Sequence, residues 1–426
     1  MIGDSVAGES VGGVLVSGPD TMGKRKNEAG LTILQHSFRP FFMAAGIWAM
    51  LAIPFWLMSY GGVLVLPAGF DGFLWHQHEM LFGFAGAAIA GFILTAIPNW
   101  TGRLPVSGWR LGLLVSFWLA GRLGFLAAAS IGPIAAAVLD LSFLTTLTVM
   151  IARELISGKN WRNLPVLVLI SLFALGNWLV HFEISGIAET AEIGIRLSTY
   201  VLAILVAVIG GRIVPSFTRN WLVRNGAEVL PEPMGRFDII ALAALIIFVV
   251  AQIFVPDHRL TSTLALLAGG LHGFRLVRWK GWAIFSEPLM WVLHLGYAWL
   301  ALALILIGLA GLTDIVPATA AIHALTVGAF GTMILAVMTR ASLGHTGREL
   351  TATPGTTVIF ILITVAAIVR VGAPFLNDQS LSAIWISGIA WTAAYGLFTV
   401  LYFPVFTQPS VQARQPSPAP TLGPGS

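Results

Sequence analysis

Histidine is the residue type best suited to metal chemistry in this chain, because its 426 residues include no cysteine. The absence of thiolates excludes iron–sulfur clusters, thiolate-bound haem and cysteine-type zinc sites. Any metal must therefore be held by His, Met, Tyr or carboxylate side chains. The chain has nine histidines, and several fall inside long apolar segments, where an ionisable side chain is costly and functional by default.

His78 and His323 begin two segments of similar sequence, HEMLFGFAGAAIAGFILTAIPNWTGR and HALTVGAFGTMILAVMTRASLGHTGR. An offset of 245 residues (323 − 78) aligns them without a gap, and the TGR triplets ending in Arg103 and Arg348 coincide. Two neutral imidazoles presented toward one axis are what a bis-histidine haem requires. We therefore predict that His78 and His323 are the axial ligands of haem b; the alternative is that each only hydrogen-bonds across helices.

His272 and His294 form a second candidate pair, on consecutive apolar segments that we expect to be antiparallel neighbours. A helix rises about 1.5 Å per residue, so the two histidines reach similar depths although their segments enter from opposite sides. Tyr297 lies three residues beyond His294 and shares its helix face. Imidazoles without thiolate suit copper or a second iron, which we predict here; the alternative is a structural contact.

Other ionisable residues near these histidines allow several interpretations. His76 points to the opposite side of a helix from His78, and shares its metal only if the helix begins near residue 78. Otherwise His76 meets a haem propionate or holds a separate metal with Glu79, so it is a third candidate ligand for copper or a second iron.

Asp140 is the one carboxylate that we expect well inside an apolar segment, without an obvious partner. We expect His181 at the outer surface in a structural role.

Arg103, Arg348 and His345 gather near helix ends that we expect at the inner membrane face. Cationic side chains are favourable at helix C-termini and in cytoplasmic loops, so about half of this clustering is expected even without a bound ligand. A quinone or anion site is the functional alternative, and we keep the three residues as supporting candidates.

The composition predicts an all-α membrane protein. The chain is 57% hydrophobic and only 10% charged, whereas a soluble protein carries roughly 25% charged residues. A net charge of +4 is too small and too dispersed to indicate nucleic-acid binding. A bilayer needs about 20 apolar residues per helix, and twelve segments meet this length. They are approximately 40–60, 76–98, 109–128, 133–153, 164–182, 194–213, 238–256, 260–277, 288–310, 317–339, 356–373 and 382–404.

Lys and Arg concentrate in alternate loops, on the side of the N-terminal Lys24-Arg25-Lys26 run. The positive-inside rule then predicts that both termini are cytoplasmic, and the regular alternation supports an even number of spans. We expect a disordered tail over residues 1–35, a transmembrane domain over 36–407 and a second disordered tail over 408–426. The matching second and tenth spans, with a weaker echo in the sixth, predict three four-helix units, about 36–158, 159–282 and 283–407, in pseudo-threefold arrangement.

The segments WHQHEMLFGFAGAAIAGFILTAIPNWTGR, GGRIVPSFTRN, LHGFRLVRWKGW and HALTVGAFGTMILAVMTRASLGHTGREL together resemble the NnrS family. The resemblance runs from about His36 to the last span. It implies a multi-pass protein of the bacterial cytoplasmic membrane that binds haem and copper and acts in nitric oxide metabolism, denitrification or nitrosative-stress resistance. The architecture also resembles, distantly, the catalytic subunit of haem–copper oxidases, although the paired histidines of spans six and seven are absent here.

The resemblance implies three kinds of partner: the lipid bilayer, nitric oxide or a related small ligand, and a quinol or other electron donor. A haem–copper oxidoreductase that turns over nitric oxide is the leading hypothesis. The alternatives are a membrane transporter and a haem-based sensor without turnover, and a reduced-minus-oxidised optical spectrum separates a haem protein from a plain transporter.

Overall fold

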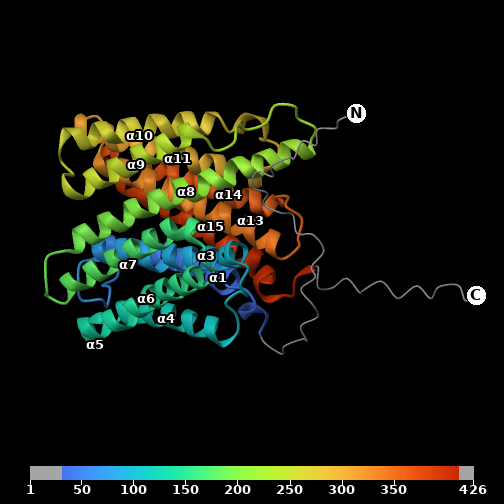
Figure 1. Cartoon of the computed structure of the whole chain (residues 1–426). Coiled ribbons are helices and arrows are strands. Elements are labelled where there is room, and N and C mark those ends of the chain that lie inside the picture. Colours follow the sequence, from blue (N-terminus) through green and yellow to red (C-terminus); the bar gives the residue numbers. More distant parts are fainter. Residues whose placement is uncertain (1–30, 412–426) are drawn as a thin grey trace, which may run out of the picture.

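The computed structural model describes residues 31–411, and every regular element within that range is helical (Figure 1). Twelve helical segments are long and apolar enough to cross a membrane, which confirms the number that hydropathy and loop charges predict. Each begins or ends within a few residues of its predicted position, except the sixth, which continues past Pro215 to Arg224. The chain is a multi-pass membrane protein.

The twelve spans, in chain order, are α1 (Phe38–Tyr60), α2, η2 and α3 as one segment (Gly72–His78, Glu79–Ala85, Gly86–Thr101), α4 (Trp109–Leu126), α6 (Pro133–Ser157), α7 (Leu164–Ile184), α8 (Ala191–Arg224), α9 (Arg236–Phe254), α10 (Arg259–Val277), α11 (Pro288–Leu312), α12, η5 and α13 as one segment (Ala318–His323, Ala324–Gly331, Thr332–His345), α14 (Pro354–Gly372) and α15 (Ser380–Thr407). A short α5 (Ala128–Ile131) joins α4 to α6. Several of these helices begin with proline at the first or second position, where its missing N–H costs no hydrogen bond.

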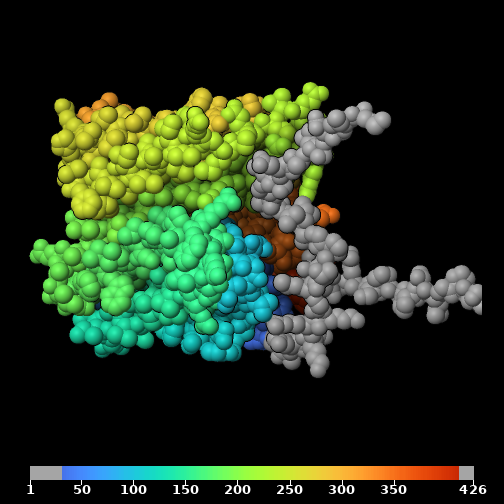
Figure 2. Space-filling model, in the orientation of Figure 1, coloured from blue at the N-terminus to red at the C-terminus, as the bar shows by residue number. Residues whose placement is uncertain are grey.

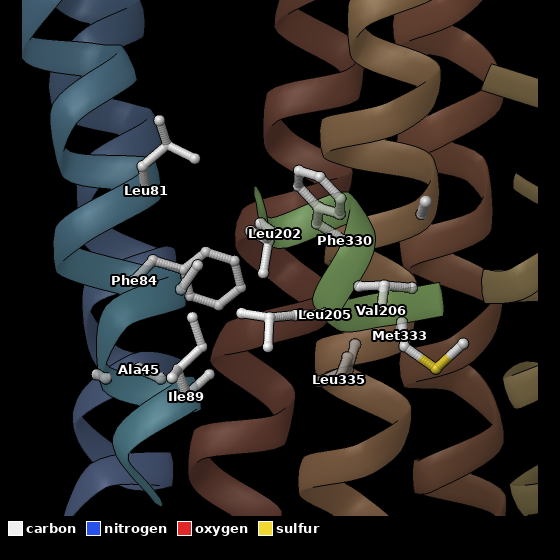
Figure 3. Packing of buried hydrophobic residues seen from close by; sticks show 14 of the residues in the cluster. Ala45, Leu81, Phe84, Ile89, Leu202, Leu205, Val206, Phe330, Met333 and Leu335 are labelled. Atoms are coloured by element: carbon white, nitrogen blue, oxygen red, sulfur yellow. The ribbon is translucent and has the colours of Figure 1, made fainter. Parts of the chain in front are cut away.

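Three spans lie at the centre of the bundle. In their most apolar stretches, 78% of the residues of the second span, 67% of the sixth and 72% of the tenth are buried, against 33–50% in the other nine. In Figure 3, Phe84 of the second span, Leu205 of α8 and Phe330 of the tenth span point into the same apolar interior. Spans two, six and ten therefore form the centre of the bundle, and the division into three four-helix units stays a prediction.

The second and tenth spans also share an unusual backbone. Each is interrupted by a π-helical stretch, η2 from Glu79 and η5 from Ala324, and the two starts are 245 residues apart (324 − 79). Matching glycines lie against indole rings: a Cβ on Gly83 would meet Trp48 Nε1 at 2.6 Å, and one on Gly328 would meet the Trp299 ring at 2.6 Å. π-Helical stretches often occur at functional sites, so both spans are candidates to carry one.

The peripheral helices face lipid. α9 and α10 lie along one side of the bundle, and α4 and α6 lie along the other (Figure 1). Figure 2 shows the face of the molecule that the green and yellow segments cover, and large apolar side chains such as Ile239, Ile247 and Phe274 are exposed on α9 and α10. Such a surface is expected where the solvent is hydrocarbon.

The two ends of the described chain meet at one end of the bundle, as an even number of spans requires. Val411 N–H donates to the carbonyl of Thr346 over 2.9 Å. The fully buried Arg39 of α1 donates from its guanidinium to the carbonyls of Val405, Phe406 and Gln408 at 2.8–3.0 Å. These carbonyls belong to the last turn of α15 and its exit, so Arg39 fastens the first helix to the last.

Candidate functional site

A cavity of about 640 Å³ lies between the central spans, at the end of the bundle opposite the two chain ends. It is lined mainly from α1, the second span, α8, the tenth span and α15, with Gln252 of α9 and Arg370 of α14, and its walls are mainly apolar. Proteins commonly house cofactors in largely apolar cavities of roughly 300–1,000 Å³ that carry a few convergent polar groups. Here those groups include His76, His323, Arg196 and Arg370.

His76 and His323 face this cavity from the second and tenth spans. The His76 ring stacks on Trp56, with centroids 4.2 Å apart, and its buried Nδ1 has no hydrogen-bond partner among residues 31–411. His323 Nδ1–H donates to the carbonyl of Thr319 over 2.6 Å, which leaves the lone pair on Nε2. A histidine fixed in this way, with one nitrogen donating to a carbonyl, is typical of a metal ligand.

Two arginines give the cavity a positive charge. Arg196 is paired with Glu192 on the same helix, whereas Arg370 makes no ion pair or hydrogen bond with any residue of the described chain. With neutral histidines, Arg196, Arg370 and Glu192 leave a net charge of +1 among the lining residues. A half-buried arginine that lines a cavity within a membrane protein, without a carboxylate partner, indicates an anionic ligand.

These residues fit a haem. Two imidazoles from different helices line one cavity, aromatic side chains such as Phe84, Phe330 and Trp391 form its walls, and Arg370 is available to a propionate. The unpartnered Nδ1 of His76 and the free Nε2 of His323 are the two observations that support this fit.

His78, which the sequence pairs with His323, does not line the cavity. Its side chain is fully buried and hydrogen-bonded at both ring nitrogens: Nδ1 lies 3.0 Å from Glu79 Oε1, and Nε2 lies 2.9 Å from Asn177 Oδ1 and 3.2 Å from Asp140 Oδ2. The structure therefore brings His76, and not His78, to the same cavity as His323.

The difference is a rotation of the second span by one residue. The sequence alignment relates the two spans by 245 positions, but their cavity-facing residues are related by 246 positions (330 − 84 = 246). The equivalent pairs are Phe73 and Thr319, Gln77 and His323, Met80 and Thr326, and Phe84 and Phe330. One residue is about 100° around a helix. The rotation buries His78 and Glu79 against polar partners on α4, α6 and α7, and this hydrogen bonding is the physical reason for it.

We call this second constellation the His78 cluster; it consists of His78, Glu79, Arg122, Asp140, Asn177 and His181. Arg122 donates from Nη1 to Glu79 Oε2 over 2.7 Å and from Nη2 to Asp140 Oδ1, and these three side chains are at most 1% exposed. His181 Nε2 lies 2.9 Å from Asp140 Oδ2.

One sequence expectation was wrong in this region, because Asp140 has several partners. His181 lies in the last turn of α7, but its side chain is buried within the cluster. Arg122 was also missed as a member of the site. The signal was present, because opposite charges on consecutive spans indicate a buried ion pair.

His272 and Tyr297 are in contact, as adjacent antiparallel α10 and α11 allow, but the site does not fit copper. His272 Nδ1 accepts from Tyr297 Oη at 2.7 Å, and its Nε2–H donates to the carbonyl of Ala241 at 3.1 Å. Arg275 also donates to Tyr297 Oη at 2.7 Å, which places a guanidinium cation against the hydroxyl that His272 contacts. His294 is turned elsewhere, with Nδ1–H donating to the carbonyl of Met290 at 3.2 Å.

The supporting residues near the chain ends have different partners. Arg103 pairs with Glu154, and the ring of His345 packs near Phe38, with centroids 5.7 Å apart. Arg348 N–H donates to the carbonyl of Leu343 at the end of the tenth span.

The NnrS family model, described as NnrS protein, matches residues 32–410. The chain belongs to the NnrS family. The match covers nearly all of the described chain, including both the cavity and the His78 cluster. No curated protein matches this NnrS-family chain.

Proposed function

We propose that this NnrS-family protein binds haem b in the cavity, with His76 and His323 as axial ligands, and acts in nitric oxide metabolism or nitrosative-stress resistance in the bacterial cytoplasmic membrane. The observation that carries the proposal is the convergence of two imidazoles, from the second and tenth spans, on one largely apolar cavity. The chain lacks the cysteines that covalent attachment needs, so the haem is held by ligation and packing alone.

The residues of the cavity have separate tasks in this proposal. Trp56 holds the His76 ring by stacking, and the carbonyl of Thr319 fixes the tautomer of His323. Arg370 and Arg196 receive the propionates, whose negative charges offset the net charge of +1. When bound, the haem supplies one-electron redox chemistry.

Nitric oxide is a small apolar gas that reaches the cavity through the membrane interior, and a quinol or another donor supplies electrons. Copper belongs to the same proposal through the family. Its expected donors, His272 and His294, are turned toward different partners, so we infer that another set of residues holds it.

The test is a reduced-minus-oxidised spectrum of the purified chain and of single variants. The wild type should show a six-coordinate low-spin haem. His76→Ala and His323→Ala should each lose that signal, because one missing axial ligand leaves the iron five-coordinate.

Two further variants serve as controls. His258→Ala should keep the wild-type spectrum, because His258 is exposed and outside the cavity. His78→Ala distinguishes the two ligand assignments: loss of the low-spin signal in this variant, with retention in His76→Ala, would overturn the assignment of His76.

A further inference from the structure

The His78 cluster joins four different spans and lies outside the cavity. Among residues 31–411, His78, Asp140 and His181 form the one group of three potential ligands whose donor atoms all lie within 4.8 Å of one another, and all three side chains are buried. They come from α2, α6 and α7, so the fold, and not local sequence, brings them together.

The hydrogen bonds of His78 cannot be completed by a neutral imidazole. Glu79 Oε1, a carboxylate oxygen, only accepts, so His78 Nδ1 at 3.0 Å must carry a hydrogen. Asn177 Nδ2 donates to Asp140 Oδ2 over 2.8 Å, which turns the carbonyl oxygen of Asn177 toward His78. His78 Nε2 therefore faces two acceptor oxygens, and a neutral ring would present a lone pair to both.

The charges of the cluster also indicate that a positive charge is missing beside His78 Nε2. Glu79 and Asp140 carry two negative charges and Arg122 carries one positive charge, which leaves the cluster at −1 when both histidines are neutral. All three side chains are at most 1% exposed, so water does not screen the imbalance. The cluster therefore favours a further positive charge, supplied by a proton on His78 or by a bound metal ion.

We propose that the His78 cluster binds a transition-metal ion, copper in preference to zinc, through His78 Nε2, Asp140 Oδ2, His181 Nε2 and Asn177 Oδ1. This gives the copper of the proposed function a site, and it uses no cavity residue. Imidazole and oxygen donors without thiolate suit Cu²⁺ and Zn²⁺, and the affinity order of divalent ions favours Cu²⁺.

The distances agree with this assignment. Ligand bonds of about 2.0 Å place neighbouring donor atoms about 2.8 Å apart in the square-planar arrangement that Cu²⁺ prefers, and about 3.3 Å apart in a tetrahedron. The separations from Asp140 Oδ2 are 3.2 Å to His78 Nε2 and 2.9 Å to His181 Nε2, and Asn177 Oδ1 lies 2.9 Å from His78 Nε2. Small outward shifts of these side chains open the centre of the group.

The surroundings resemble the supporting residues of a metal site. Histidine ligands usually donate their second nitrogen to a carboxylate, as His78 does to Glu79. Arg122 donates hydrogen bonds to Glu79 Oε2 and to Asp140 Oδ1, the other oxygen of that carboxylate. The Nδ1 atom of His181 is buried without a partner, so no second hydrogen bond holds that ring away from an ion.

The experiment uses the full chain, purified in detergent and stripped of metal with a chelator. Cu²⁺ and Zn²⁺ are added separately by equilibrium dialysis, and bound metal and haem are measured in the same samples. The wild type should bind one tight ion per cluster, with Cu²⁺ favoured. His181→Gln should lower the affinity more than 10-fold, and Glu79→Gln by about 10–100-fold, with the haem spectrum unchanged.

The matched control is His272→Ala, which removes an equally buried histidine from the other polar group and should leave metal affinity unchanged. Electron paramagnetic resonance of the Cu²⁺-loaded wild type should show coupling to two imidazole nitrogens, a readout that does not depend on any variant folding.

Three results would overturn the proposal. In the first, the wild type keeps its haem but binds no stoichiometric Cu²⁺ or Zn²⁺. In the second, the His181→Gln variant has wild-type metal affinity. In the third, the His272→Ala variant loses the ion. The first would mean that a proton on His78 is the missing cation. Loss of haem with retention of this ion would instead contradict only the haem proposal.

Discussion

Replacing Arg122 with Met tests whether water is excluded from the His78 cluster. In the native protein the guanidinium contacts Glu79 at 2.7 Å and also Asp140, and all three side chains are at most 1% exposed. Arg122→Met fills a similar volume but leaves two buried carboxylates without their cation. Breaking one buried ion pair in this way costs about 3–5 kcal/mol, and with two carboxylates affected we expect the upper part of that range.

The measurement is the unfolding of the purified protein in mixed micelles as the fraction of SDS is raised. Arg103→Met is the matched control, because Arg103 and its partner Glu154 are 41% and 17% exposed. Pairs of this kind contribute about 0–1 kcal/mol. The double variant Arg122→Met/Glu79→Gln should recover part of the loss, because one of the two unpaired charges is removed.

A loss of less than about 1 kcal/mol for Arg122→Met, equal to that of Arg103→Met, would refute this reasoning. It would mean that water enters the cluster and screens its charges. The charge argument for a bound cation would then fail as well.

Three other predictions concern packing, hydrogen bonding and topology. Gly328→Ala places a Cβ within 3 Å of an indole ring and should cost about 1–3 kcal/mol in the same unfolding assay, whereas Gly270→Ala has open space and should be neutral or stabilising. Tyr297→Phe removes a hydroxyl that contacts an imidazole and a guanidinium, and should cost about 1–3 kcal/mol without changing the haem spectrum. Reporter fusions after Arg340 should report cytoplasm and those after Asp314 periplasm; a periplasmic signal at Arg340 would contradict the predicted orientation.

The spans could be predicted almost completely, because a run of about 20 apolar residues is a strong signal and the loop charges count the crossings independently. The long α8 shows the limit of this signal, since its last turns, beyond Pro215, are no longer apolar. The family resemblance from the quoted motifs was also confirmed.

The site was less predictable, because it depends on rotation about helix axes. Sequence alignment relates His78 to His323, but the helix turns His76 toward the cavity so that His78 and Glu79 can reach polar partners on other spans. Which side of a helix faces a cavity depends on such contacts between distant residues. Asn177 gives no signal at all by itself, since a lone Asn in an apolar span is compatible with many roles.

The contact of Arg39 with the last helix has a consequence for biosynthesis. The guanidinium of this first-helix residue donates to the carbonyls of Val405, Phe406 and Gln408, which leave the ribosome after almost all of the described chain. Until then, Arg39 lacks these acceptors and stays in contact with water or lipid headgroups at the membrane surface. Closure of the bundle is therefore delayed until α15 has been synthesised, and the cavity, which α15 lines, stays open on that side until then.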